Sequence, residues 1–381
     1  MLSGYNKSPE IKIKILFIAA FDSPHIRKWY DYFAKQQNIE SRLFIAKNHL
    51  ISNTFFSKLK YYFTIRGIIK RAIKEFKPNI INIHTVHFPN YTVPNYFEGK
   101  LVVTPWNGDI LWHAYGKEFF FLQILSEKIT RKLKERRIAK VLSSASLISY
   151  NSEEMGKKCN NLLNSKVDLV KICVPGVDCS IWIKPDNKAV VRKKLGIPVD
   201  KFVILSMRNL SDFYNVDVIA RSIKIVVENH RDILFVFKHM DSQNLHDITE
   251  IVNKSKVADH VRFVGSVDYK QILSYYQASD IGISISSNDS CPMSVLEGMS
   301  CQLPMLVGDI PVTREIIENN VNGILVPCKD HISLAETILR LKENPELRER
   351  LGFNARESVV VKYDYSENMQ RMLKLFNNMV A

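Results

Sequence analysis

The chain has 381 residues, enough for two domains of ordinary size, and its 46% hydrophobic and 24% charged residues are typical of a soluble folded protein. It has no run of about 18 apolar residues that could span a bilayer, and Met1–Glu10 lacks the apolar core of a secretion signal. We therefore expect a cytoplasmic protein. The formal charge is +14, and residues 1–180 hold 28 Lys and Arg against 14 Asp and Glu, whereas residues 181–381 hold 25 of each. This asymmetry predicts an anionic partner for the first half, with solvated surface lysines as the alternative.

In the first half, short apolar runs alternate with longer amphipathic segments. The apolar runs predict strands at Ile13–Ala19, Leu43–Ala46, Ile80–His84, Leu101–Thr104, Leu147–Tyr150 and Leu169–Val174. The segments between them predict helices at Pro24–Gln36, Lys58–Phe76, Phe119–Leu142 and Glu153–Leu163.

The second half repeats this alternation. Its predicted strands are Phe202–Met207, Leu234–Phe237, Val261–Val264, Ile281–Ser284, Met305–Val307 and Gly323–Val326. Its predicted helices are Val216–Asn229, His246–Ser255, Lys270–Gln277, Ser294–Ser300, Val312–Glu318 and Ile332–Leu341. Apolar strands that alternate with helices indicate α/β units with doubly wound parallel sheets, covered by helices on both faces.

The stretch Pro175–Pro198, rich in proline, glycine and charge, has the composition of a linker between the halves. We predict a first Rossmann-like domain at residues 1–178 and a second at 179–361. A C-terminal helix at 362–381 is expected to cross back to the first domain. Because such units bind ligands outside the carboxyl ends of their strands, two facing units predict a site in the cleft between them.

The stretch from Asp289 to Pro304 is the most informative. Asp289 follows the strand Ile281–Ser284, and a helix begins near Ser294 with Glu297 in its first turns. A helix N-terminus offers unpaired N–H groups and a positive dipole end, which suit a phosphate. The Glu297 carboxylate can accept two hydroxyl hydrogen bonds, as a ribose diol requires. Alternatively, Asp289 is a plain loop residue and Glu297 only favours the helix dipole.

This stretch, followed by Val307–Pro311, Arg314-Glu315 and Asn322–Val326, resembles the donor-binding signature of family 4 retaining glycosyltransferases, which have the GT-B fold. The resemblance implies that Glu297 holds the ribose and that Asp289 contacts the donor sugar. It also implies that the backbone N–H groups at the helix start bind the diphosphate. The implied donor-binding residues are Arg208, Tyr214, Asn215, Lys238, Val264, Gly265, Asp289, Met293, Ser294, Val295 and Glu297.

Leu205–Asp217 resembles the family loop in which an Arg and a Lys grip the donor phosphates. Arg208 matches the Arg, but the Lys position falls on Tyr214, which cannot supply a cation. Lys238, after the next strand, is the candidate replacement, with a plain surface lysine as the alternative. Val264-Gly265 resembles the loop that meets the nucleobase through its backbone.

The first half carries weaker matches to the same family. Ser23–Trp29 resembles its opening loop and helix, and Thr104–Leu111 resembles a Thr-x-His-Gly-Ser-Asp segment, with Trp106 at the usual His position. The implied acceptor-side residues are Ser23, His25, His84, Trp106 and Asp109. The implied catalytic residues are Asp109, Arg208, Asp289 and Glu297. A hydrogen-bonded structural role for His84, and passive lining by Trp106, are the alternatives.

The resemblance implies a nucleotide-sugar-dependent hexosyltransferase that acts with retention, and the lack of an Asp-x-Asp motif predicts no metal. We expect a UDP-sugar rather than a GDP-sugar as co-substrate, no further cofactor, and a role in cell-surface polysaccharide or glycolipid synthesis. The alternatives are a non-hydrolysing sugar-nucleotide epimerase and a degenerate GT-B scaffold or partner subunit. A dinucleotide-dependent dehydrogenase is disfavoured because Ala19–Pro24 lacks the Gly-x-Gly-x-x-Gly turn.

Two basic segments bear on the partners. Lys128–Lys140 has seven basic residues and one acid, with Ile129, Leu133, Ile138 and Leu142 on one side at helical spacing, and Lys58–Lys77 is a second basic helix. Basic amphipathic helices are typical of binding to an anionic membrane surface. We therefore expect a peripheral membrane protein with a lipid-linked or acidic saccharide acceptor, and no nucleic acid. Alternatively, the apolar stripe packs on the sheet.

Overall fold

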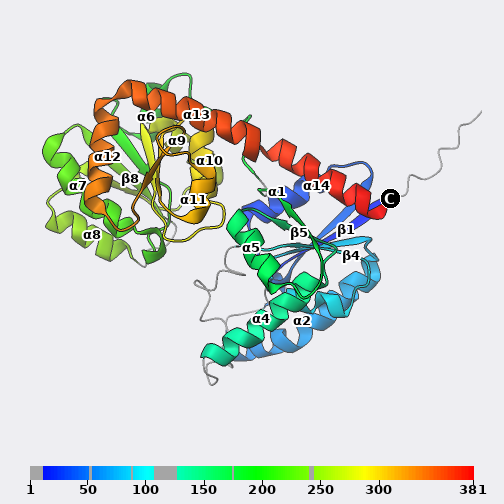
Figure 1. Cartoon of the computed structure of the whole chain (residues 1–381). Coiled ribbons are helices and arrows are strands. Elements are labelled where there is room, and N and C mark those ends of the chain that lie inside the picture. Colours follow the sequence, from blue (N-terminus) through cyan, green and yellow to red (C-terminus); the bar gives the residue numbers. More distant parts are fainter. Residues whose placement is uncertain (1–11, 51–53, 87–88, 107–126, 174–175, 240–243) are drawn as a thin grey trace, which may run out of the picture. The chain divides into compact units, whose positions relative to one another are not determined.

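The computed structural model describes residues 12–50, 54–86, 89–106, 127–173, 176–239 and 244–381. The chain forms two compact units (Figure 1). Unit 1 comprises the chain up to Pro175 together with Glu367–Ala381, and unit 2 comprises Gly176–Ser366. Each unit is built on one six-stranded parallel sheet, and each is described by itself.

The sheet of unit 1 has the strand order β2-β1-β3-β4-β5-β6, and every neighbouring pair is parallel. Its strands are β1 (Ile13–Ala19), β2 (Ile39–Ile45), β3 (Ile80–His84), β4 (Lys100–Thr104), β5 (Leu147–Tyr150) and β6 (Asp168–Lys171). The central strand β3 is buried along its whole length. This matches its continuous apolar sequence, which is typical of a strand covered on both faces.

Helices cover both faces of this sheet. They are α1 (Pro24–Ala34), α2 (Phe55–Phe76), α4 (Glu127–Ser143), α5 (Glu153–Leu162) and α14 (Tyr365–Val380), with the 3-10 turns η1 (Ala46–His49) and η2 (Asn90–Asn95). One core cluster joins alternate strand residues such as Ile81 and Ile83 to α2, α4 and α5. On the other face, Phe17 of β1 contacts Phe33 of α1, which stacks on Phe376 of α14 at 5.0 Å between ring centroids.

The sheet of unit 2 has the order β12-β11-β10-β7-β8-β9, again parallel throughout. Its strands are β7 (Phe202–Ser206), β8 (Ile233–Lys238), β9 (Val261–Val264), β10 (Ile281–Ser284), β11 (Met305–Gly308) and β12 (Ile324–Val326). β7 lies between β10 and β8, so the chain turns back at this point of the sheet. Ligands of doubly wound folds bind beside such a switch point, at the carboxyl ends of the strands.

The helices of unit 2 are α6 (Lys188–Leu195), α7 (Val216–Asn229), α8 (Leu245–Lys254), α9 (Tyr269–Ala278), α10 (Met293–Ser300), α11 (Pro311–Ile316), α12 (His331–Glu343) and α13 (Pro345–Tyr363), with the 3-10 turns η4 (Asp212–Tyr214) and η5 (Ala258–His260). α7 packs against α8 and α12 over one face of the sheet (Figure 1). α10 packs against β10, β11 and α13. The start of α10 therefore lies at the carboxyl edge of β10.

The predicted class, two α/β units with doubly wound parallel sheets, is confirmed, and all twelve predicted strands are present. β2 begins at Ile39, four residues earlier than predicted. The prediction began too late because Glu40 and Arg42 interrupt the apolar pattern of this edge strand. α6 lies inside the stretch that was read as a linker, and α13 was not predicted. The part of the predicted helix Phe119–Leu142 before Glu127 lies outside the described residues.

Candidate functional site

Polar side chains gather in unit 2 at the carboxyl ends of β7, β8 and β10. Arg208 follows β7, Lys238 ends β8, and Ser284 ends β10. Asp289 lies in the loop between β10 and α10, and Glu297 lies in the second turn of α10. Because these three strands are adjacent in the sheet, their ends bring residues that are up to 89 positions apart into one site.

Arg208 and Asp289 form the central ion pair. Arg208 Nη2 donates to Asp289 Oδ2 at 2.6 Å and Nε donates to Ser284 Oγ at 2.8 Å. The side chains of Arg208 and Asp289 are only 13% and 12% exposed, so each charge is stabilised mainly by the other and little by water. Burial disfavours the charged guanidinium, but the Asp289 carboxylate outweighs it, and the pKa of Arg208 lies above its usual value. The guanidinium also lies 5.0 Å from the ring centroid of Tyr214.

The second oxygen of Asp289 organises the loop before α10. Asp289 Oδ1 accepts hydrogen bonds from the backbone N–H groups of Ser290 at 2.8 Å and Cys291 at 3.3 Å. Asp289 therefore connects the cation after β7 to the loop that leads into α10. We infer that this carboxylate positions Arg208 as much as it could contact a ligand.

Glu297 is held by two tyrosines of α9. Tyr269 Oη donates to Glu297 Oε1 at 3.1 Å. Tyr276 Oη has one proton, which it shares between the Ser294 carbonyl at 2.8 Å and Glu297 Oε2 at 3.4 Å. Burial, reinforced by the Glu297 carboxylate, raises the pKa values of both phenols above their usual range. Both tyrosines therefore stay protonated and act as donors that fix the carboxylate.

Lys238 is 8% exposed and belongs to the same cluster. Burial lowers its pKa below the usual value, and the nearby Glu297 carboxylate partly offsets this. Lys238 thus interacts electrostatically with the side chain predicted to hold a ribose. Its role in replacing the missing lysine at Tyr214 stays a prediction.

The start of α10 is open to a ligand in the way that helix N-termini are. Its N-cap, Pro292, provides no side-chain hydrogen bond, and the N–H groups of the first turn have no partners inside a helix. Val295 N–H is the exception, since it donates to the Pro292 carbonyl at 2.8 Å. This leaves Met293 and Ser294 as the better placed of the three predicted backbone donors. Ser294 Oγ is buried and has no hydrogen-bond partner among the described residues.

Asn215 fixes the loop after β7. It adopts a left-handed conformation (φ 50°) that asparagine tolerates better than most residues, and its side-chain amide donates to the Ile285 carbonyl at 2.6 Å and to Ser287 Oγ at 2.8 Å. Its Oδ1 accepts a hydrogen bond from Lys329, which follows β12. Sequence reasoning singled out Asn215 but missed Lys329.

The two residues predicted to contact the nucleobase lie at the end of β9: Val264 is its last residue and Gly265 follows it. The Val264 carbonyl accepts a hydrogen bond from His239 N–H at 3.0 Å. A side chain at Gly265 would meet no atom within 4 Å, so its backbone faces open space. The backbone at Gly265 is therefore accessible, while that of Val264 is partly occupied.

The predicted acceptor-side residues lie in unit 1. Ser23 caps α1 by accepting from Ile26 N–H at 3.2 Å, so it has a structural role. His25 lies 6.0 Å from Trp106 between ring centroids, and burial, with a contribution from Lys28, lowers its pKa to about 4. The structure brings these two rings together at the carboxyl edge of the sheet.

His84 lies deeper, with 1% exposure, between Phe17 and the Trp29 ring at 4.9 Å. Burial lowers its pKa to about 3, so the ring is neutral at ordinary pH. Neither ring nitrogen has a hydrogen-bond partner within the described ranges, which differs from the hydrogen-bonded structural role that was the alternative. Asp109 lies outside the described residues.

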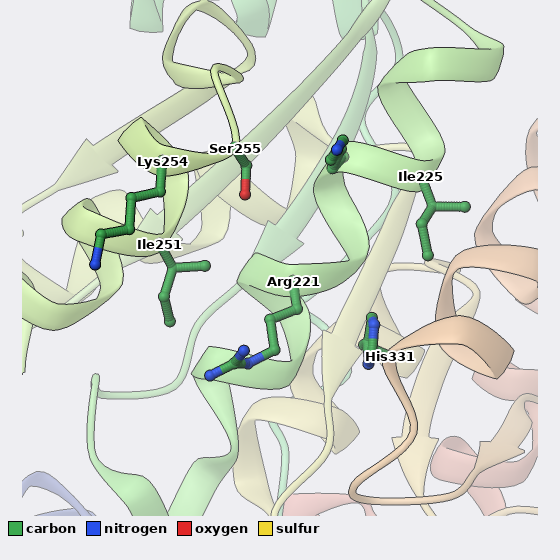
Figure 2. Close-up of a pocket in the computed structure, with 7 residues that line it drawn as sticks. Arg221, Ile225, Ile251, Lys254, Ser255 and His331 are labelled. Carbon is green, nitrogen blue, oxygen red and sulfur yellow. The ribbon is translucent and has the colours of Figure 1, made fainter.

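A separate pocket of about 340 Å³ lies in unit 2, between α7, α8 and the start of α12 (Figure 2). It is lined by Arg221, Lys224, Ile225, Ile251, Lys254, Ser255 and His331. Each of its Arg and Lys side chains is paired with an acid four residues away on its own helix. Because these charges are already compensated, we assign the pocket no ligand.

Two Rossmann-like units, each built on one six-stranded parallel sheet, are the fold class of GT-B proteins. The solved structure of a sucrose-phosphate synthase from Thermosynechococcus elongatus shares this fold, with a TM-score of 0.78 and 16% identity over 97% of this chain and 99% of that chain. The HepE protein of Anabaena, solved in complex with UDP, has a TM-score of 0.75 and 16% identity over 96% of this chain and 100% of its own.

Residues 187–358 match the family described as Glycosyl transferases group 1. Among curated relatives, the D-inositol 3-phosphate glycosyltransferase of Thermomonospora curvata is 24% identical over 229 residues, which is 56% of this chain and 53% of the relative. The chain thus spans about half the length of the curated relatives it matches.

The site also contains residues that the sequence motifs did not predict. Ser284, Tyr269 and Tyr276 carry no family motif that the sequence reading used, yet they fix the two predicted ligand-binding side chains. One signal was available: Tyr269 and Tyr276 are seven residues apart, which is two helical turns, so they lie on one face of α9. The predicted helix began one residue after Tyr269, at Lys270.

Proposed function

We propose that this protein is a glycosyltransferase that moves a sugar from a nucleotide diphosphate donor to an acceptor. The observation that carries the proposal is the cluster of Arg208, Asp289 and Glu297 beside the open start of α10. It combines a cation, a helix N-terminus and a fixed carboxylate. These are the groups needed to bind a phosphate and a diol next to each other.

The proposed donor is a UDP-sugar. HepE has been solved with UDP and with UDP-glucose and has the same fold, which supports a uridine donor for this chain. In the proposed complex, the Glu297 carboxylate accepts hydrogen bonds from the ribose hydroxyls. The accessible backbone at Gly265 is the proposed contact to the base.

In the proposed reaction, the bond between the anomeric carbon and the diphosphate oxygen breaks, and the acceptor hydroxyl oxygen bonds to that carbon with retention. The hydroxyl proton passes to the leaving diphosphate, on which charge develops as the bond breaks. Preorganised donors stabilise such charge without reorganisation cost, and Arg208 is held in place by Ser284 and Asp289 for this purpose. We propose that this cation and the α10 N–H groups take the role that a metal has in other transferases.

A donor turnover assay tests the proposal. The purified chain is incubated with UDP-glucose and UDP-N-acetylglucosamine, and released UDP and sugar products are followed by NMR. We expect slow release of UDP and free sugar, lowered about tenfold or more in Glu297→Gln because a charged hydrogen-bond acceptor is lost. Gln can still accept from Tyr269, so the fold is retained. An epimerised nucleotide sugar would indicate the epimerase instead, and donor binding without turnover would indicate a degenerate scaffold.

We further propose that the protein works on an anionic membrane surface, in polysaccharide or glycolipid synthesis with a lipid-linked or acidic acceptor. None of the described helices is long and apolar enough to cross a membrane. Ile138 and Leu142 of α4 are buried and Leu133 is half-buried, so this part of the apolar stripe packs in the core, as the alternative held. The surface that supports membrane binding is on α2, where Phe56 and Phe63 are 80% and 72% exposed.

A further inference from the structure

Arg208 and Lys238 do not supply the positive charge that the proposed donor site needs, because a carboxylate compensates each of them. Arg208 is neutralised at 2.6 Å by Asp289, and Lys238 interacts with Glu297. Two cations thus face two carboxylates, for a net charge of zero. A nucleoside diphosphate brings further negative charge, so its binding calls for a cation that no carboxylate compensates.

Lys329 is such a cation. It is exposed, and its ammonium donates to Asn215 Oδ1 at 2.5 Å. Among the described residues it makes no ion pair with a carboxylate. With Lys329 added, the side chains of Arg208, Lys238, Lys329, Asp289 and Glu297 sum to a net charge of +1.

The place of this ammonium is set by Asn215. Asn215 is fully buried and its amide is fixed by the Ile285 carbonyl and Ser287 Oγ, so Lys329 is hydrogen-bonded to a rigid group. Asn215 directly follows Tyr214, whose ring lies beside the Arg208 guanidinium. The loop after β12 therefore delivers a cation next to the residue where the lysine of the resembled signature is missing.

We propose that Lys329 binds the diphosphate of the donor in place of the lysine that Tyr214 replaces. An ammonium has three donors and no acceptor, so two N–H groups are left for phosphate oxygens while one holds Asn215. This inference rests on the proposed function. It differs from the role predicted for Lys238, which interacts electrostatically with Glu297, the side chain predicted to hold the ribose.

Calorimetric binding of UDP and of uridine to the full chain tests the inference, because uridine lacks the phosphates. Lys329→Met is expected to weaken UDP binding about tenfold or more because a charged hydrogen bond to phosphate is lost. Uridine binding should be unchanged, since Asn215 loses its bond to Lys329 but keeps those to the Ile285 carbonyl and Ser287 Oγ. Lys238→Met is expected to weaken both ligands by a similar factor. Lys224→Met is the matched control, since it removes an exposed lysine from α7 of the same unit, and it should change neither.

Rescue gives the second arm of the test. In the Lys329→Met background, Tyr214→Lys should restore UDP binding by returning a cation to the neighbouring position. The inference is overturned if Lys329→Met binds UDP as the unaltered chain does, or if the phosphate-dependent loss follows Lys238→Met instead. If the unaltered chain binds UDP no better than uridine, the proposed donor itself is wrong, and that outcome is distinct from both.

Discussion

At the scale of single residues, the pairing of Arg208 with Asp289 links ligand binding to folding stability. Each side chain is nearly buried and each is the charge partner of the other. Removing one partner of a buried ion pair leaves an uncompensated charge, whereas removing both often costs little. Loss of activity in an Arg208 variant therefore needs a stability measurement beside it.

A double-mutant cycle follows from this pairing. Arg208→Met should lower the free energy of unfolding of unit 2 by about 3 kcal/mol because Asp289 is left buried and charged. Arg208→Met combined with Asp289→Asn should recover a large part of that loss, while donor binding stays impaired. Urea unfolding of the single and double variants measures both effects. Strictly additive losses in the cycle would show that the pair is not coupled.

The sequence predicts some of the residues of the site and not others. Arg208, Asp289 and Glu297 were found because each follows a recognisable strand or opens a helix in a family-like motif. Lys329 could not be found, since its partner Asn215 is 114 residues away and only the packing of the loop after β12 against the loop after β7 brings them together. A sequence motif predicts the element in which a residue lies. It does not predict a contact between two distant loops, which depends on the whole fold.

At the scale of elements, the strands were predicted well because apolar runs of three to seven residues are a direct consequence of burial on both faces. α13 was missed because exposed apolar residues, such as Phe353 and Val361, obscure the buried stripe of Leu351, Ala355 and Val359. For α4 the apolar stripe was recognised, but its direction was not, since periodicity alone does not tell a membrane-facing stripe from a core-facing one.

α2 carries two apolar stripes on different sides. Ile65, Ile69 and Ile73 are buried in unit 1, whereas Phe56 and Phe63, seven residues apart, are exposed on the side that also presents Lys60, Lys70 and Lys74. An exposed aromatic pair among lysines matches a helix that lies in the headgroup region of an anionic bilayer. The basic excess of residues 1–180 supplies the complementary charge.

Liposome flotation tests this surface of α2. The chain should float with anionic vesicles at low salt, be released at high salt because the attraction is screened, and ignore neutral vesicles. Phe56→Ser with Phe63→Ser should reduce flotation several-fold, while Phe353→Ser, which changes an exposed phenylalanine of α13 in unit 2, is the matched control. Equal flotation of all variants would assign the binding to another surface, and no flotation would remove the membrane from the proposal.

At the scale of the whole molecule, the chain runs from unit 1 into unit 2 and returns. The two connecting segments pair with each other: Val177 N–H donates to the Tyr363 carbonyl at 2.8 Å, and Tyr365 N–H donates to the Val177 carbonyl at 2.9 Å. After this parallel bridge, α14 packs on unit 1, where Asn368 donates to the Cys173 carbonyl at 2.9 Å. The last residues of the chain therefore complete the unit that the first residues begin.

This arrangement predicts that the stability of unit 1 depends on the C-terminal helix while that of unit 2 does not. Phe376 is fully buried and stacks on Phe33, so Phe376→Ala should destabilise unit 1 by about 3–5 kcal/mol through lost burial and a cavity. Hydrogen exchange resolved by peptide measures the two units separately, with β1 and β3 reporting unit 1 and β7 and β10 reporting unit 2. Faster exchange should be confined to unit 1, and UDP binding at the cluster of unit 2 should be unchanged. Uniformly faster exchange in both units would instead mean that the chain unfolds as one cooperative body, in which the donor site depends on α14 as well.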